Sequence, residues 1–207
     1  MINEEGAENL KQHKYSGQDL GLAWIYFYNP VSRWLTDRIP ESIAPNTITL
    51  LGFLHTILPA VILYTTIGTS LAGDMPVWFL YLQAWCYFWG RMLDEMDGKQ
   101  ARRTGNSSPL GMLFDHGCDA FSVGTQVLIY TRFIQVGDNF ISPFLVFACV
   151  ANFHFATLEE YYLGELTLPM CNGVSDGSVA IIGMTLFSAL IGGSNFWATP
   201  IYDATAW

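Results

Sequence analysis

Charged side chains are scarce in this sequence, and basic ones are especially few. They make up 13% of the 207 residues, with nine Lys and Arg against 18 Asp and Glu, for a formal net charge of −9. A soluble domain carries about 25% charged residues, and a nucleic-acid-binding domain presents a basic surface. The composition therefore argues against a soluble domain and excludes nucleic acid as a partner.

Paired cysteines and a basic leader segment are also missing from the sequence. The cysteines form no C-x-x-C pair and lie in or beside apolar stretches, which predicts free, packed thiols. They are Cys86, Cys118, Cys149 and Cys171. Residues 1–5 are polar and acidic. We therefore expect no cleavable signal peptide, and the first long apolar segment should act as the membrane anchor.

Long apolar stretches are abundant in the sequence. Hydrophobic residues make up 51% of the chain, and the mean hydropathy is +0.29. The stretches, each about the twenty residues that a membrane-spanning helix requires, are 47–68, 77–96, 110–136, 140–162 and 174–195. Their lengths and nearly uncharged middles disfavour the buried core of a soluble protein. We predict an all-α, polytopic integral membrane helical bundle with about five transmembrane helices.

The distribution of basic residues predicts how the bundle is oriented. Those before the first apolar stretch and in the second connection are Lys11, Lys14, Arg33, Arg38, Lys99, Arg102 and Arg103. The first connection has neither Lys nor Arg. By the positive-inside rule, both basic regions are cytosolic. Arg132, near the opposite side, is an exception to this pattern.

A short amphipathic segment precedes the first apolar stretch. Apolar side chains recur there at helical spacing, at Val31, Trp34, Leu35 and Ile39. Asn29-Pro30 is a suitable helix start, because Asn caps helices and Pro is tolerated in the first turn. The pattern predicts an interfacial amphipathic helix, although aromatic residues at this spacing are as common in ordinary packing. We divide the chain into a polar tail at 1–19, an interfacial segment at 20–43 and a membrane domain at 44–207.

One run of residues carries the chemistry of the chain. It reads Asp94-x-x-Asp97-Gly98-x-x-Ala101-Arg102 and continues after eight residues with Gly111-x-x-x-Asp115-x-x-x-Asp119. The first two aspartates are three residues apart and the last two are four apart, so each pair shares one face of its own helix. Carboxylates at membrane depth are costly. We therefore expect the two helices to converge these side chains on a cation.

The residue types favour a divalent metal and a phosphate-containing substrate. Oxygen ligands without clustered His or Cys suit magnesium, calcium or manganese, and magnesium sites combine a few carboxylates with substrate phosphates. Gly98 and Gly111 would let backbone or substrate approach closely, while Lys99 and Arg102 could neutralise phosphate oxygens. The alternative, helix caps and loop salt bridges, does not require this many fixed offsets at once.

The run matches a known signature, D-x-x-D-G-x-x-A-R-x8-G-x-x-x-D-x-x-x-D, at every specified position, and the chain resembles the CDP-alcohol phosphotransferases. Its surroundings, D-G-K-Q-A-R-R-T at 97–104 and F-D-H-G-C-D at 114–119, are similar to the eukaryotic cholinephosphotransferase and ethanolaminephosphotransferase branch. Segments 44–49 and 168–177 agree with that branch as well. The resemblance covers about residues 20–195.

The resemblance implies an enzyme of phospholipid synthesis. It would transfer phosphocholine or phosphoethanolamine from CDP-choline or CDP-ethanolamine to diacylglycerol and release CMP. The implied location is the membrane of the endoplasmic reticulum or Golgi, with several crossings and an active site that faces the cytosol. The implied ligands for a pair of Mg2+ or Mn2+ ions are Asp94, Asp97, Asp115 and Asp119. Implied contacts to the CDP ester are Asn46, Asp94, Gly98, Ala101, Arg102 and Gly111, although Asn46 alone could be an ordinary helix cap.

Two residues are candidates for the general base that takes the lipid hydroxyl proton. Asp119 ends the signature and resembles the base proposed across the broad family. His116 is peculiar to the branch, and histidine side chains titrate near neutral pH. The sequence leaves this choice open, as it does the choice between choline and ethanolamine.

Departures from the branch bear on activity. Met112 follows Gly111 where relatives have Glu. Leu158 stands where relatives have Trp before two acidic residues, so an aromatic residue that contacts the substrate headgroup could be missing. We also expect the membrane domain to be truncated at its C-terminus, so that a homodimer is implied only for full-length relatives. The main alternative is an inactive relative that binds metal or nucleotide without turnover. A different CDP-alcohol enzyme is disfavoured by the motif's surroundings, and an ion or solute carrier would not need Ala101 and Arg102 at fixed offsets.

Overall fold

Long helices make up most of the part of the chain that the structure describes. The computed structural model describes residues 17–198, so most of the predicted tail at 1–19 lies outside the described residues. The main helices are α3 (Pro45–Ile62), α4 (Val77–Thr104), α5 (Pro109–Phe133), α6 (Ile141–Leu163) and α7 (Asp176–Leu190). The all-α prediction is confirmed, apart from a small parallel pair of three-residue strands, β1 (Gly17–Asp19) and β2 (Leu166–Leu168).

Proline, serine and glycine fix the ends of the helices that carry the signature. Pro45 and Pro109 lie in the first turns of α3 and α5, where the missing N–H costs nothing and the fixed φ suits a helix. The Ser108 hydroxyl accepts the Gly111 N–H at 3.0 Å and caps α5. Gly105, after α4, has the left-handed conformation (φ +69°) that ends many helices. A short polar turn therefore joins α4 to α5.

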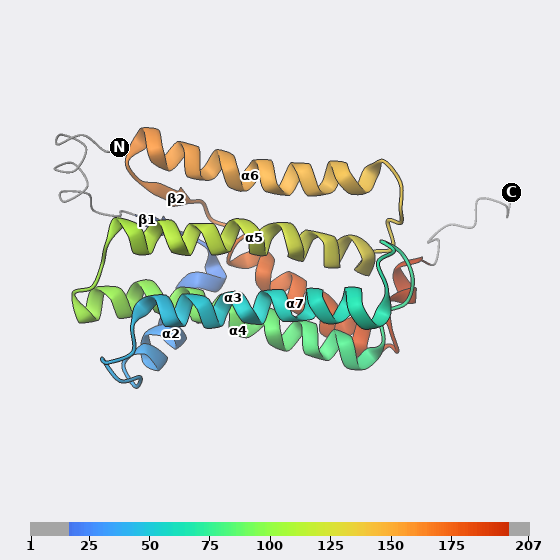
Figure 1. Cartoon of the computed structure of the whole chain (residues 1–207), viewed down its shortest axis with the longest axis horizontal. Helices are drawn as coiled ribbons and strands as arrows, with labels where there is room; N and C mark the ends of the chain where they lie inside the picture. The colour runs from blue at the N-terminus through green and yellow to red at the C-terminus, as the bar shows by residue number, and fades with distance from the viewer. Residues whose placement is uncertain (1–16, 199–207) are drawn as a thin grey trace, which may run out of the picture.

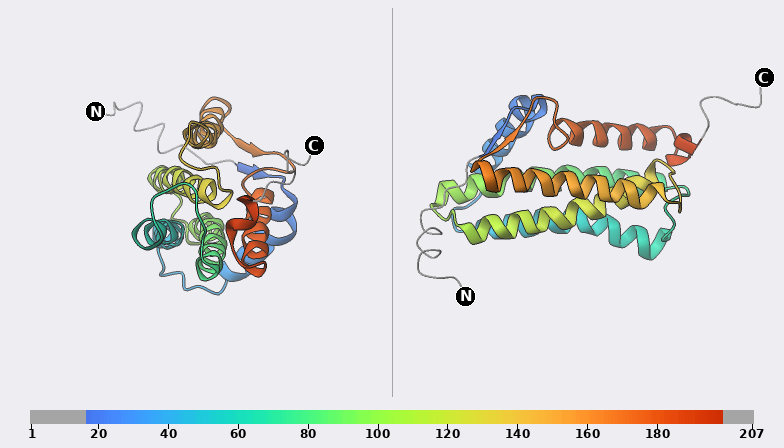
Figure 2. Two further views of the ribbon diagram at one scale, coloured as in Figure 1. Left: turned by 90° about the vertical axis from the view of Figure 1, so that its right-hand side faces the viewer. Right: turned by 90° about the horizontal axis from the view of Figure 1, so that it is seen from above.

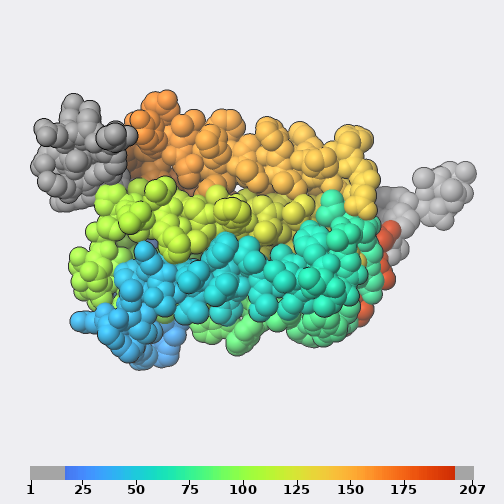
Figure 3. Space-filling model, viewed as in Figure 1, coloured from blue at the N-terminus to red at the C-terminus, as the bar shows by residue number. Residues whose placement is uncertain are grey.

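The arrangement of the helices places α3 at the centre of the signature region. Both α4 and α5 pack along α3, while α7 lies against α4 and α6 lies on the outer side of α5 (Figures 1 and 2). In the space-filling view, α6 forms a separate ridge along one edge of the molecule (Figure 3). The first turns of α3 and α5 and the last turns of α4 lie at the same end of the bundle.

Within residues 17–198, two helical stretches have the length and composition of membrane-spanning helices. They are α6 and Pro45–Ile67, which joins α3 to the π-helical turn η2 (Leu63–Ile67). Of the apolar window of α6, 6% is buried, and exposed rings such as Phe144 and Phe147 lie along the helix. A lipid environment would remove this apolar surface from water. Helix α7 is apolar but shorter, at 15 residues. The figure of about five crossings stays a prediction.

Glycines allow α3 and α4 to approach closely beside the candidate site. A Cβ added at Gly52 would lie 3.2 Å from the Gly90 carbonyl oxygen, and one added at Gly90 would lie 2.6 Å from Thr56 Cγ2. Thr56 cannot easily turn aside, because its hydroxyl donates to the Phe53 carbonyl at 2.8 Å and is 2.8 Å from the Ser122 hydroxyl. Small residues at this contact therefore set the distance between the two helices.

We expect Gly90→Ala to destabilise the protein by about 1–3 kcal/mol, the usual cost of an added methyl group in a closely packed core. Gly124→Ala on α5 is the matched control, because nothing lies within 4 Å of the added Cβ there. Alanine is the better helix former, so the control should be neutral or slightly stabilising. Thermal unfolding in detergent, followed by circular dichroism, measures both. Equal midpoints for the two variants would contradict the close-contact argument.

The helix of the N-terminal segment begins earlier than the sequence predicts. An α-helix does begin at Asn29 with Pro30 in its first turn, as predicted, but the chain is already helical from Leu22, so Asn29 lies inside a longer helix and does not cap it. Its upstream N–H groups have carboxylate acceptors: Asp176 accepts from Ala23 at 2.8 Å, and Asp19 from Gly21 at 2.7 Å. The π-helical turn η1 (Trp24–Tyr28) lies just before Pro30, where the proline ring would clash with a regular α-helical turn.

The helix α2 (Asn29–Thr36), which follows η1, is amphipathic, but its tryptophan lies on the exposed side. Val31, Leu35 and Ile39 pack on the apolar cluster around Tyr28. Trp34 is 54% exposed, with the Arg38 guanidinium 3.7 Å from its ring centroid. The sequence pattern placed Trp34 on the same apolar face as Val31, Leu35 and Ile39, but in the structure its side chain is exposed. An exposed tryptophan beside arginine suits the headgroup region, and the interfacial location stays a prediction.

Arg132, the exception to the charge pattern, is buried at the end of the bundle opposite to the signature. Its guanidinium donates to the carbonyl oxygens of Gly68 at 3.0 Å and Ser70 at 2.8 Å, in the loop after η2. In the same loop, the Leu71 N–H and the Ser70 hydroxyl donate to Asp138 and hold the pKa of that carboxyl below its ordinary value. Arg132 thus stabilises the loop that follows η2.

The cysteines agree in part with the prediction of free, packed thiols. All four are free. Cys86 is buried and Cys118 is half-buried, but Cys149 and Cys171 are exposed, so the prediction of packing is wrong for those two. Exposure of apolar and sulfur-containing side chains on α6 follows from its position on the outside of the bundle.

Candidate metal and substrate site

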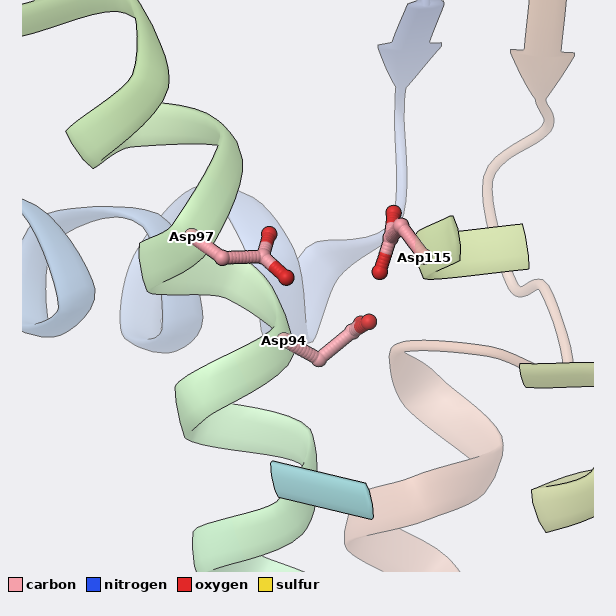
Figure 4. Close-up of side chains that lie close together, drawn as sticks. All are labelled: Asp94, Asp97 and Asp115. Carbon is pink, nitrogen blue, oxygen red and sulfur yellow. The ribbon is translucent and has the colours of Figure 1, made fainter. Parts of the chain in front are cut away.

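Helices α4 and α5 bring three of the four signature aspartates together. Asp94 and Asp97 extend from α4 toward Asp115 on α5 (Figure 4). One carboxylate oxygen from each of the three lies within 4.8 Å of the others. The two residues on α4 are three apart, so their side chains leave the same face of the helix about one turn from each other. The geometry would allow all three to bind a single cation.

Asp97 is the most firmly held of the three. Its side chain is buried, and Thr49 on α3 donates its hydroxyl to Asp97 Oδ2 at 2.5 Å. The Gly98 N–H donates to the other oxygen, also at 2.5 Å. These charge-assisted hydrogen bonds fix the orientation of the carboxylate. Thr49 was not singled out from the sequence, and its position on the face of α3 that meets α4 becomes visible only in the packed helices.

Asp115 provides the observation that best fits a bound cation. Its Oδ1 atom is buried and has no hydrogen-bond partner among the described residues 17–198. An unpaired buried carboxylate oxygen is costly, and it faces two further carboxylates. Divalent cations such as Mg2+ take oxygen ligands of this kind. The donor set of this cluster therefore fits the predicted metal.

Asp119 lies one turn beyond Asp115 on α5, near enough to Asp94 for the two carboxyl groups to interact electrostatically. It is outside the group of three whose oxygens lie within 4.8 Å of one another. The arrangement extends the acidic cluster along α5. The binding of a pair of metal ions by all four aspartates stays a prediction.

The predicted CDP contacts gather at the same end of the bundle. A Cβ added at Gly111 would lie 3.5 Å from Asn46 Oδ1, so the first turns of α3 and α5 meet there. A Cβ added at Gly98 would lie 3.5 Å from Arg102 Nη1. Arg102 is exposed and Ala101 is half-buried. Small residues and an exposed guanidinium leave room for a phosphate-containing ligand next to the acids.

Two nearby side chains have other partners than the sequence suggests. Lys99 donates to the Glu95 carboxylate at 2.9 Å and to the Glu95 carbonyl at 3.1 Å, and its ammonium lies 5.9 Å from the Trp24 ring centroid. It therefore contacts the N-terminal segment, which disfavours its assigned role in neutralising phosphate. His116 Nδ1 lies 4.0 Å from a carboxylate oxygen of Glu160, on α6.

Position 158 is placed away from this contact. Leu158 is 37% exposed, whereas the Glu160 side chain is 13% exposed. Two residues along a helix correspond to a rotation of about 200°. Leu158 and Glu160 thus point in nearly opposite directions, and the structure gives no support to the hypothesis that residue 158 contacts the substrate headgroup.

Comparison with known proteins assigns the chain to a family. A family model described as CDP-alcohol phosphatidyltransferase matches residues 42–198, which include the whole acidic cluster. The chain belongs to this family. The resemblance seen in the sequence is thereby confirmed.

Several relatives of the CDP-alcohol phosphatidyltransferase family cover nearly all of the chain. Choline/ethanolaminephosphotransferase 2 of Arabidopsis thaliana is 37% identical over 200 residues, which are 96% of this chain and 50% of the relative. Cholinephosphotransferase 1 of Gallus gallus is 38% identical over 89% of this chain and 55% of its own length. Choline/ethanolaminephosphotransferase 1 of Saccharomyces cerevisiae is 30% identical, over 99% and 52%. The chain spans about half the length of the curated relatives it matches.

Proposed function

We propose that this chain is an integral membrane CDP-alcohol phosphotransferase that transfers phosphocholine or phosphoethanolamine from its CDP ester to diacylglycerol and releases CMP. The observation that carries the proposal is the convergence of Asp94, Asp97 and Asp115, with an unpaired buried oxygen, within a complete family signature. The names of the relatives in the comparison support the choice of choline or ethanolamine.

The proposed metal is Mg2+ or Mn2+, bound as a pair of ions by Asp94, Asp97, Asp115 and Asp119. When bound, the ions supply positive charge that neutralises the pyrophosphate and stabilises the departing CMP. The protein's own contribution is to hold the carboxylates in place, through the hydrogen bonds to Asp97. Contacts to the CDP ester would come from Asn46, Asp94, Gly98, Ala101, Arg102 and Gly111.

In the proposed reaction, the lipid hydroxyl oxygen forms a bond to the phosphorus that carries the headgroup. The phosphoanhydride P–O bond breaks, CMP departs with the bonding electron pair, and the hydroxyl proton passes to a base. We favour His116 as that base over Asp119. The Glu160 carboxylate lies 4.0 Å from His116 Nδ1, close enough to help orient the ring. Asp119 is one of the aspartates proposed to bind the metal ions, so its carboxylate would be less free to accept a proton.

The proposed setting is the membrane of the endoplasmic reticulum or Golgi, with about five crossings by residues 44–207, an interfacial segment at 20–43 and the acidic site facing the cytosol. The apolar stretches Pro45–Ile67 and α6 support the membrane location. The basic residues around the α4–α5 turn support the orientation. Diacylglycerol would then reach the site from the bilayer, and the CDP ester from water.

A membrane assay tests the proposed activity. Membranes containing the chain are incubated with diacylglycerol and radiolabelled CDP-choline or CDP-ethanolamine, with Mg2+ or with a chelator. We expect labelled phospholipid to form with Mg2+ and to fall to background with the chelator, because the acidic cluster cannot neutralise the pyrophosphate alone. Membranes without the chain are the control. Metal or CDP binding without labelled lipid would instead support an inactive relative. The replacement of a carboxylate by Met112 favours that alternative.

A further inference from the structure

A buried arginine lies next to the acidic cluster, outside the signature. Arg91 precedes Asp94 by one turn of α4, and its side chain is 12% exposed. One of its terminal NH2 groups donates to Asp94 Oδ2. The other donates to Glu95 at 2.5 Å and lies 3.5 Å from the Ser175 hydroxyl, just before α7. Because both arms of the guanidinium are engaged by carboxylates, Arg91 is not placed to bind a substrate phosphate.

The contacts around Glu95 keep the arginine in one position. The Glu95 side chain is 11% exposed, accepts from Lys99 at 2.9 Å and accepts from the Trp24 indole N–H at 3.1 Å. The Arg91 guanidinium also lies 5.5 Å from the Tyr28 ring centroid. The arginine is therefore held by α4, by η1 of the N-terminal segment and by the residue that precedes α7. Three separate parts of the chain fix its orientation.

A fixed arginine restricts the carboxylate that it binds. With one Asp94 oxygen held by Arg91, the carboxylate has fewer orientations, and the one in the structure faces Asp97 and Asp115 (Figure 4). Substitution of a group that hydrogen-bonds to a metal ligand and orients it typically changes metal affinity or activity by about 10–100-fold. We propose that Arg91 is a positioning residue for the acidic cluster and links Asp94 to the N-terminal segment. This inference rests on the proposed function.

The test compares two arginine-to-lysine variants of the whole chain. Arg91→Lys keeps the positive charge but removes the planar fork, so we expect Mn2+ to bind about tenfold more weakly. Arg103→Lys is the matched control: Arg103 lies on α4 too, but it donates to the carbonyl oxygens of Thr36 and, at 2.8 Å, Ile39. We expect its Mn2+ affinity to equal that of the wild type. Electron paramagnetic resonance of Mn2+ measures binding, and thermal unfolding measures stability.

A double-mutant cycle separates positioning from a general structural effect. In the Asp94→Asn background, at Mn2+ concentrations raised to match the weaker binding, Arg91→Lys should cause no further loss, because its partner is already altered. A purely structural role would weaken binding in both backgrounds. If Arg91→Lys does not unfold cooperatively, Glu95→Gln takes its place, since it removes the outer charged partner of Arg91. Its several-fold loss should also vanish in the Asp94→Asn background, where a general charge effect would persist.

The outcomes distinguish this inference from the proposed metal site. Equal Mn2+ affinity of the wild type and Arg91→Lys, or an equal loss in both backgrounds, overturns the positioning role and leaves the metal site intact. Absence of Mn2+ binding to the wild-type chain overturns the metal site and the inference with it. A loss confined to the background with Asp94 intact supports both.

Discussion

Asp97→Asn should abolish turnover while the protein still folds and inserts. The substitution keeps the size of the side chain but removes one anionic ligand beside Asp94 and Asp115, each of which offers an oxygen within 4.8 Å. Substituting a residue that hydrogen-bonds to a metal ligand typically lowers metal affinity or activity by about 10–100-fold. The loss of a ligand itself should therefore lower kcat/KM by at least about 100-fold. The measurement is the labelled-lipid assay at a series of Mg2+ concentrations, together with Mn2+ binding.

The control for this prediction is another aspartate-to-asparagine change. Asp37 is exposed and follows α2, away from the acidic cluster. Asp37→Asn should leave both turnover and Mn2+ affinity at wild-type values. Asp97→Asn should also retain the circular dichroism and detergent elution of the wild type, since Thr49 can still donate to the amide oxygen. Wild-type turnover in the Asp97→Asn variant would contradict the assignment of Asp97 as a metal ligand.

His116→Ala and Asp119→Asn should lower the rate in different ways. A positioned general base contributes about 10²–10⁴-fold, so His116→Ala should reduce kcat by that amount with little change in Mn2+ affinity. Asp119→Asn should reduce kcat and weaken Mn2+ binding together, because its carboxylate lies beside Asp94 in the acidic cluster. The measurements are kcat at saturating Mg2+ and the Mn2+ dissociation constant for each variant.

The comparison also has a result that reverses the assignment. If His116→Ala keeps the full rate while Asp119→Asn loses it at unchanged Mn2+ affinity, Asp119 is the base. His154→Ala provides the control, because His154 is an exposed histidine on α6. It should keep the wild-type rate, which would show that the effect at position 116 is not a general result of removing an imidazole.

The last turns of α4 contact both α5 and the N-terminal segment. The aspartates face α5, whereas other residues of the same run bind the N-terminal segment. Gln100 donates to the carbonyl oxygens of Pro40 at 3.1 Å and Ile43 at 3.0 Å, and Arg103 donates to those of Thr36 and Ile39. Several residues around the signature aspartates therefore support the position of α4.

The sequence by itself determined where the helices lie and which acids could meet. Apolar runs, Pro45, Pro109 and Gly105 act through local backbone geometry, and the spacing of aspartates along a helix fixes the face that they share. These are effects over a few residues, so they can be predicted before the fold is known.

Contacts between distant parts of the chain were decided only by the tertiary structure. The hydrogen bond from Thr49 to Asp97 joins residues that are 48 apart in the sequence. Asp176 accepts from the Ala23 N–H, 153 residues away, at the start of the N-terminal helical segment. The Lys99 ammonium lies 5.9 Å from the Trp24 ring centroid for the same reason, whereas its bond to Glu95, one turn back on α4, is a local contact. A side chain's partner depends on which helix packs beside it, and no local pattern specifies that neighbour. The sequence therefore indicated which aspartates are candidate ligands, and the packing of α3, α4, α5 and the N-terminal segment decided which residues hold them in place.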